Sequence, residues 1–410
     1  MRIVEFWGPG PDLARYLELP ARLYAGDPHW IPPSRDALLA AFSPANPFFL
    51  VGTARHFLAL DGDQPVGRVT AIRNRRLETR EGPVGLLGFF ECEPDLAVAN
   101  RLLSAAAEHL RSAGARTVRA PVEFDTWHRY RFMLKGFDEP PILLEPYNKP
   151  YYPPFFLSLG FREAVRYVSK EVSDLPPVLE RLLPRHATTL AGGFRFRSLQ
   201  GEPLGPALRL LHRLAMEACA GNWGYTEISE GEFLMLHGGA GVRLDPDLVL
   251  VVENRAGEPA GFVLCFPNTL PRRTGGNGDL PALNVMTVGV LPRYRRMGLG
   301  KALVAEAYRR ALAKGYRSAH HCLVREGSPA AGFDAGFGRI HKRYAVYEMG
   351  LDGPDEGVPG SPAGEQRRAP QIERRGESGR ACRPPATSSG RAGSDRCDLR
   401  AAGEAPPPAR

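Results

Sequence analysis

Residues 288–300 read Val-Gly-Val-Leu-Pro-Arg-Tyr-Arg-Arg-Met-Gly-Leu-Gly, and residues 301–308 continue as Lys-Ala-Leu-Val-Ala-Glu-Ala-Tyr. The apolar start predicts a β-strand, and the periodic run from Leu299 to Lys314, followed by Gly315, predicts a helix. A loop that opens a helix leaves several backbone N–H groups without intrahelical partners, so that they point at one place where an anion can bind. We call residues 292–300 the glycine loop and expect it to bind a phosphorylated ligand.

Two common phosphate-binding loops do not fit the spacing of the glycine loop. A Walker A loop needs a glycine where Arg295 stands and a hydroxyl side chain where Ala302 stands. A dinucleotide-binding fingerprint needs a small residue where Leu303 stands, and it also needs a carboxylate at a set distance. A third kind of loop is therefore expected.

The pattern Pro292-x-x-Arg295-x-x-Gly298-x-Gly300 resembles the acyl-CoA pyrophosphate loop of the GNAT superfamily of N-acyltransferases, whose signature is Gln/Arg-x-x-Gly-x-Gly/Ala. The surrounding elements follow the order of that superfamily's second half, with expected strands at 247–253, 260–266, 318–324 and 341–349. The resemblance implies an acyl-CoA-dependent N-acyltransferase in which an amine attacks the thioester directly. Acetyl-CoA is the expected donor.

The same resemblance implies a role for residues around the loop. Backbone N–H groups from Arg295 to Lys301 would hold the pyrophosphate, with Arg293 adding charge, and the N–H of Val290 would donate to the tetrahedral oxyanion. An amine with a pKa of ~10.4 must lose a proton before it attacks, and Glu253 is the candidate base. The expected acyl-CoA contacts are Val288, Val290, Arg295, Arg296, Met297, Gly298, Leu299, Gly300 and Lys301.

The expected general acid is missing from its usual position. Relatives place a tyrosine before a Gly-Phe pair, and the aligned segment at 326–337 has Gly332 there. Tyr344 and Tyr347 on the last strand are the remaining candidate acids, while at most one of His320 and His321 can face the cleft, since neighbours in a strand alternate faces. Two alternatives stay open: a catalytically silent acyl-CoA-binding or scaffold protein, and a charged-tRNA-dependent transferase.

The first half of the chain repeats this architecture without the glycine loop. Strands are expected at 56–60, 66–72, 85–90 and 117–121, with a helix at 96–112. The sequence Glu91-Cys-Glu-Pro-Asp95 stands at the loop position, and its carboxylates would repel a pyrophosphate. The whole pattern resembles a bacterial family of tandem GNAT-like proteins.

We therefore predict an α/β (α+β) fold of two tandem GNAT-like lobes, each a mixed, mostly antiparallel sheet flanked by helices. The expected boundaries are 1–175 for a degenerate first lobe and 176–351 for the lobe with the acyl-CoA loop. Residues 352–410 are rich in Pro, Gly, Ser and Arg, and so are expected to form a disordered tail.

Composition limits the class of protein further. The net charge is +8, yet no zinc spacing, aromatic ladder or basic helix supports a nucleic-acid partner. Six cysteines form no Cys-x-x-Cys pair, and neither a signal sequence nor an 18-residue apolar run is present. We expect a cytoplasmic protein without a metal that acts on a small-molecule or peptide amine and does not act at a membrane.

Overall fold

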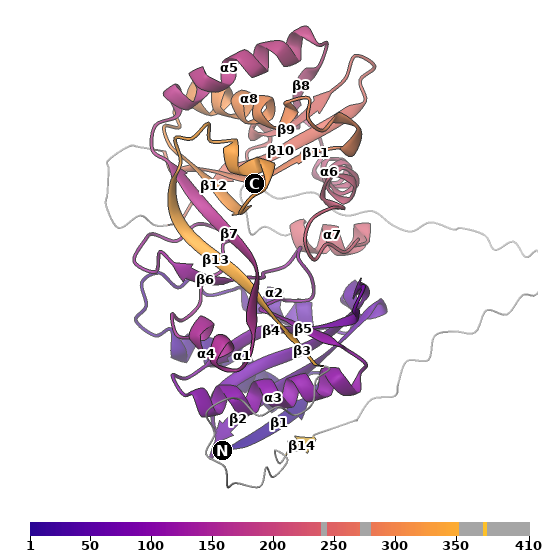
Figure 1. Cartoon of the computed structure of the whole chain (residues 1–410), viewed down its shortest axis with the longest axis vertical. Helices are drawn as coiled ribbons and strands as arrows, with labels where there is room; N and C mark the ends of the chain where they lie inside the picture. The colour runs from indigo at the N-terminus through magenta and orange to yellow at the C-terminus, as the bar shows by residue number, and fades with distance from the viewer. Residues whose placement is uncertain (239–243, 271–279, 352–371, 375–410) are drawn as a thin grey trace, which may run out of the picture. The chain divides into compact units, whose positions relative to one another are not determined.

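A computed structural model describes residues 1–238, 244–270, 280–351 and 372–374, and residues Met1–Arg375 form one compact unit. The centre of this unit is a single sheet of 14 strands among the described residues (Figure 1). Its order is β14-β1-β2-β3-β4-β5-β13-β7-β12-β11-β10-β9-β8, and β6 pairs with β13 outside this path.

The first half of the chain contains a meander of long strands with helices on both faces. Asp95 caps helix α3 by accepting hydrogen bonds from the N–H groups of Ala97 and Val98. The apolar face of α3 then packs on the sheet through Leu102, Leu103 and Leu110. The elements are β1 (Arg2–Phe6), α1 (Pro11–Leu23), α2 (Arg35–Phe42), β2 (Gly52–Asp61), β3 (Gln64–Thr79), β4 (Gly82–Cys92), α3 (Leu96–Ser112), β5 (Thr117–Ala120), β6 (Phe132–Lys135) and α4 (Tyr152–Ser158).

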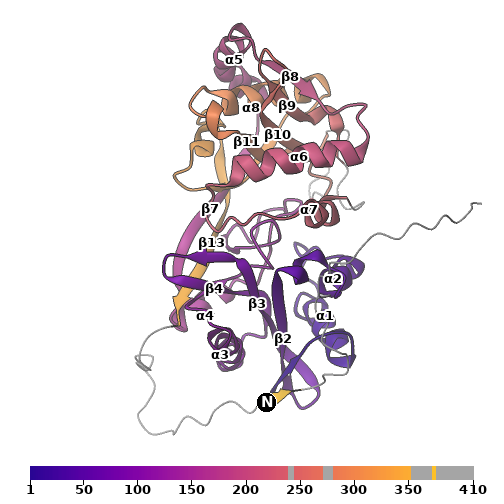
Figure 2. The ribbon, with the colours of Figure 1, turned by 90° about the vertical axis from the view of Figure 1, so that its right-hand side faces the viewer.

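The second half contains the glycine loop and places two helices on each face of the sheet (Figures 1 and 2). Helices α5 and α8 share one apolar core with the sheet, and α6 and α7 share another. The elements are α5 (Leu175–Ala191), β8 (Arg195–Ser198), α6 (Leu204–Cys219), α7 (Glu230–His237), β9 (Val249–Glu253), β10 (Pro259–Pro267), β11 (Leu283–Val290), α8 (Leu299–Ala313) and β12 (Ala319–Arg325). The strands and helix predicted around the loop are thus present, with small shifts at their ends.

Two long strands, β7 (Arg162–Val172) and β13 (Arg339–Gly350), join the halves. Strand β7 pairs with β12 of the second half, and β13 pairs with both β7 and β5 of the first half. The strand expected at 341–349 therefore completes the sheet of the first half as well as the second. The residue boundaries of the two lobes stay a prediction, because these strands have neighbours in both.

Most of the predicted disordered tail lies outside the described residues. Within it, residues 372–374 form β14 (Ile372–Arg374), which pairs in parallel with residues 3–5 of β1. Among the described helices, none has both the length and the apolar character that a membrane-spanning segment requires.

Candidate active site

The glycine loop presents a row of backbone donors at the start of α8. Gly298 is the N-cap of the helix and has a φ of 82°, while Arg296 has a φ of 65°. Within the described part of the chain, no hydrogen bond engages the N–H groups of residues 296–301. The N–H of Arg295 donates to the carbonyl oxygen of Pro292 at 3.2 Å, so the available donors begin one residue later than predicted.

Both glycines of the loop also lie close to side chains of other segments. A Cβ atom on Gly298 would lie 2.4 Å from Cδ of Arg185, and one on Gly300 would lie 2.5 Å from Cζ of Phe333. The predicted reason for glycine at positions 298 and 300 was only the close approach of a phosphate. The structure adds the close packing of α5 and of the segment after β12 against the start of α8.

Strands β11 and β12 separate beside the loop. Their parallel pairing covers residues 283–285 and 319–321, after which β12 continues along β7. The N–H of Leu291 donates to the carbonyl oxygen of Ala260 on β10. Successive N–H groups along a strand point to opposite sides. The N–H of Val290 therefore points away from β10 toward β12, which is the orientation that its predicted oxyanion role requires.

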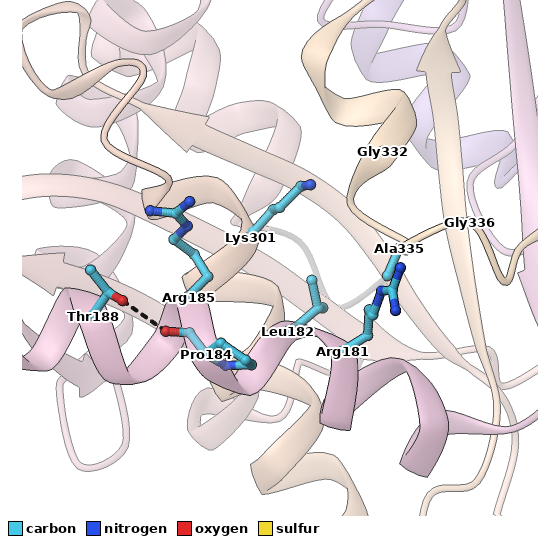
Figure 3. A pocket seen from close by; sticks show the side chains of 9 residues that line it. All are labelled: Arg181, Leu182, Pro184, Arg185, Thr188, Lys301, Gly332, Ala335 and Gly336. Carbon is cyan, nitrogen blue, oxygen red and sulfur yellow. Dashed lines mark hydrogen bonds between the residues drawn. The ribbon is translucent and has the colours of Figure 1, made fainter.

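A pocket of about 540 Å³ lies between α5, the first turn of α8 and the segment after β12. Figure 3 shows the side chains of Arg181, Arg185 and Lys301 around it. Gly332, the residue at the position of the missing tyrosine, also lines the pocket, and nothing lies within 4 Å of the place where its Cβ would be. The further lining residues are Leu182, Pro184, Thr188, Ala335 and Gly336.

Arg181 and Arg185 were not among the predicted site residues. They lie on α5, far from the glycine loop along the chain, and only the packing of α5 on α8 brings them to the loop. Their four-residue spacing in a helical segment was the available signal, because residues i and i+4 share one face of a helix.

The predicted acids and base do not line this pocket. Glu253, at the end of β9, accepts a hydrogen bond from Nε of Arg197 at 2.8 Å. The hydroxyl of Tyr344 is buried and donates to the carboxylate of Glu145, and burial raises the pKa of Tyr344 well above its usual value. Tyr347 is buried in the same apolar core as the inward-facing residues of α3. Their catalytic roles remain predictions.

The two neighbouring histidines of β12 are both buried and face opposite sides. Nε2 of His321 lies 2.6 Å from the hydroxyl of Tyr308 on α8, and burial lowers the pKa of His321 to about 4. Nδ1 of His320 lies 2.9 Å from Oδ1 of Asn284 on β11, and the His320 ring stacks on His341. This arrangement agrees with the expectation that the two rings occupy different faces.

A buried carboxylate fixes α5 beside α8. Glu306 of α8 accepts hydrogen bonds from Arg309 and Arg310 of the same helix, and its Oε2 lies 3.1 Å from Nε2 of His186 on α5. Burial raises the pKa of Glu306, but the hydrogen bonds from Arg309, His186 and Arg310 outweigh burial and hold the pKa well below its usual range. This carboxylate therefore helps to keep Arg185 beside Gly298.

We expect Glu306→Gln to lower the free energy of unfolding at pH 7 by about 2 kcal/mol, because the substitution removes the charged acceptor of this network. A depressed pKa stabilises the fold above the unfolded value of ~4.3, and this stabilisation is lost as pH falls toward the folded value. The difference in the free energy of urea unfolding between the two proteins should therefore stay constant from pH 7 to pH 5 and shrink as the pH falls below ~4.3. Glu180→Gln, an exposed position on α5, is the control. Equal stability of Glu306→Gln and the wild type at pH 7 would contradict this account.

A sequence model of the Acetyltransferase (GNAT) family matches residues 211–333, a range that contains the glycine loop. A relative from Caulobacter vibrioides (strain NA1000 / CB15N), named bacterial ceramide synthase, is 32% identical over 263 residues, which are 63% of this chain and 67% of the relative. The chain belongs to the GNAT family. The predicted resemblance is confirmed, and this GNAT protein is an acyltransferase.

Other comparisons agree with the GNAT assignment. Protein YghO of Escherichia coli (strain K12) is 26% identical over 277 residues, covering 66% of this chain and 69% of YghO. The solved structure of a tandem GNAT protein from the clavulanic acid biosynthesis pathway is similar in fold, with a TM-score of 0.52 and 15% identity over 86% of this chain and 99% of that protein. The predicted fold class is confirmed.

Proposed function

We propose that this GNAT protein transfers a fatty acyl group from acyl-CoA to the primary amine of a long-chain amino alcohol. The observation that carries the donor half of this proposal is the row of unengaged N–H groups at residues 296–301, because they suit the diphosphate of CoA. The acceptor half is supported by the name of the Caulobacter relative. A ceramide is the amide of a fatty acid and a long-chain amino alcohol.

The geometry beside the loop is compatible with the proposed reaction. The amine nitrogen attacks the thioester carbon, the C–N bond forms, and the C–S bond breaks to release the CoA thiolate. The N–H of Val290 points toward the side where β11 and β12 separate, and it would donate to the transient oxyanion. The nitrogen loses a proton to a base, and the thiolate gains one from solvent or a side chain.

The missing tyrosine is compatible with this reaction. A thiol has a pKa of ~8.5, so a thiolate is a good leaving group near neutral pH and needs less acid assistance than an amine or an alcohol. Gly332 at that position leaves open space instead of a side chain.

The test is a transfer assay with the full chain. Palmitoyl-CoA and acetyl-CoA are each incubated with sphinganine, lysine and a small aliphatic amine, and free thiol and the amide product are measured. We expect thiol release coupled to N-palmitoylsphinganine. Equal or faster transfer from acetyl-CoA would reject a fatty acyl donor, and transfer to the other amines but not to sphinganine would reject the acceptor. Saturable CoA binding without thiol release would reject turnover.

A further inference from the structure

Another cavity lies in the first half of the molecule, where β4 and β5 separate. The two strands pair in parallel over residues 84–86 and 117–119, and beyond that point the cavity is lined by residues of β4 and of segments 121–132 and 146–148. Its volume is about 50 Å³, which is room for roughly three or four water molecules. It corresponds in position to the separation of β11 and β12 beside the glycine loop.

Four charged side chains line this cavity, and two of them neutralise each other. Arg129 pairs with Glu123, with 3.1 Å between nitrogen and oxygen. Glu91 and Arg131 remain, one carboxylate and one guanidinium, and the other walls are mainly aromatic. A ligand that fits this cavity should therefore have one group of each charge.

Glu91 has one carboxylate oxygen in use and one available. Oε2 accepts hydrogen bonds from the hydroxyls of Tyr24 and Tyr152 at 3.0 and 2.8 Å, whereas Oε1 accepts none within the described part of the chain. Arg68 is the neighbour of Glu91 on β3, but its guanidinium donates to the carbonyl oxygen of Tyr16 at 2.8 Å. Burial raises the pKa of Glu91, and the charge of Arg68 offsets this effect only in part. Glu91 thus lacks a cation in direct contact.

Arg131 is held firmly but lacks an anion. Its guanidinium carbon lies 3.5 and 4.0 Å from the ring centroids of Tyr130 and Tyr167, and Nη2 donates to the hydroxyl of Tyr130. Nε is buried without a partner, and Nη1 makes no hydrogen bond with any described residue. The backbone of Arg131 has a φ of 93°, and such left-handed residues other than glycine cluster at ligand-binding sites.

We propose that this cavity binds a small α-amino acid as its zwitterion, with the ammonium group on Oε1 of Glu91 and the carboxylate on Arg131. Charge-assisted hydrogen bonds are strong, and an arginine can donate to both oxygens of a carboxylate. Glycine, the smallest α-amino acid, suits the volume. It would not be acylated there, because Asp95 caps α3 and engages the first N–H groups of that helix. Binding in this cavity is independent of the acyl transfer proposed above.

Calorimetric titration of the full chain with glycine, acetate and methylammonium tests the proposal. Acetate is glycine without the ammonium group, and methylammonium is glycine without the carboxylate. We expect the wild type to bind glycine at least about tenfold more tightly than either fragment, because each fragment forgoes one charge-assisted hydrogen bond. Leucine should not bind, because its side chain exceeds the cavity.

Two substitutions separate the two ends of the ligand. Glu91→Gln should weaken glycine binding about tenfold without weakening acetate binding, and Arg131→Gln should do the same without weakening methylammonium binding. Arg131→Lys should restore part of the loss, since it keeps the charge. The matched controls are Glu81→Gln and Arg80→Gln in the exposed turn between β3 and β4, and they should change no affinity.

The absence of saturable heat from glycine in the wild type would overturn the proposal, and the cavity would then hold water only. Equal affinities for glycine and its two fragments would overturn it too, as would glycine binding that both Glu91→Gln and Arg131→Gln leave unchanged. The comparison of glycine with its fragments needs no variant, so a folding defect in a variant, detected by thermal unfolding, leaves this test intact.

Discussion

Gly298→Glu should reduce kcat/KM for acyl transfer at least about 100-fold, because the change places a carboxylate where the diphosphate needs positive potential, a loss of about 3 kcal/mol or more. The backbone adds to the effect. Gly298 has a φ of 82°, and a side chain there would meet Arg185. The rate of thiol release from the donor, measured over a range of donor concentrations, gives kcat/KM.

The control for this substitution is Gly114→Glu. Gly114 also has a left-handed backbone, with a φ of 84°, but nothing lies within 4 Å of the place of its Cβ, and it follows α3 in the other half. Both variants thus add one carboxylate and one strained residue, and only the first does so at the loop. If Gly298→Glu had the same kcat/KM as Gly114→Glu, the glycine loop would not be the donor site.

The fold should lose stability steeply as the pH falls from 6.5 to 5. Burial lowers the pKa of four described histidines, including His341, and lowers it most for three of them: His56 to about 3 and His237 and His321 to about 4. In the unfolded chain each of these histidines takes up a proton near pH 6.5, whereas in the folded chain it stays neutral to a lower pH. Its contribution to the free energy of unfolding is therefore complete above pH 6.5 and is lost as the pH falls below it. Each of the three histidines thus lowers the free energy of unfolding by about 2 kcal/mol at pH 5. Urea unfolding at pH 7, 6 and 5 measures the loss.

His56→Phe separates the contribution of one histidine. The ring of His56 is buried against Trp7 and Phe42, and its Nδ1 lies 2.9 Å from Oγ1 of Thr70, which also contacts the hydroxyl of Tyr16. His56→Phe should lower the free energy of unfolding by about 1 kcal/mol at pH 7, because the hydrogen bond to Thr70 is lost. It should also reduce the loss of stability between pH 6.5 and pH 5 by about a third.

The control for His56→Phe is Ile72→Val in the same core, which should cost about 1 kcal/mol at every pH. Unfolding free energies of the wild type that stay constant from pH 7 to pH 5 would show that the buried histidines do not control acid stability.

Local sequence patterns were enough to predict the elements that position the glycine loop. The apolar strand before Pro292, the helix after Gly298 and the hairpin at 249–267 each follow from a pattern within about 20 residues. The free donors at the start of α8 follow from the same local pattern, because a helix start without a capping side chain leaves its first N–H groups unpaired.

The residues that could not be predicted depend on contacts between distant segments. Arg181 and Arg185 reach the loop because Val178 and Leu182 pack α5 into the same core as Leu303 of α8. Nothing local to α5 indicates that partner. The pocket therefore could not be found from the loop motif alone.

The tyrosines of β13 illustrate the same limit. Tyr344 packs in the core with Phe124, while Tyr347 packs in the core with Phe156, because residues an odd number apart in a strand face opposite sides. Which core each face of β13 meets depends on its pairing with β5 and β7, and a strand pattern does not specify the pairing partners.

The pairing of β13 with β5 has a consequence for synthesis of the chain. Until residues 347–350 have left the ribosome, β5 has β4 on one side but lacks its neighbour β13 on the other, and one edge of the first half's sheet is open. The first half therefore completes its sheet after the second half has been translated, so we expect the nascent polypeptide to need protection from strand-to-strand aggregation during translation.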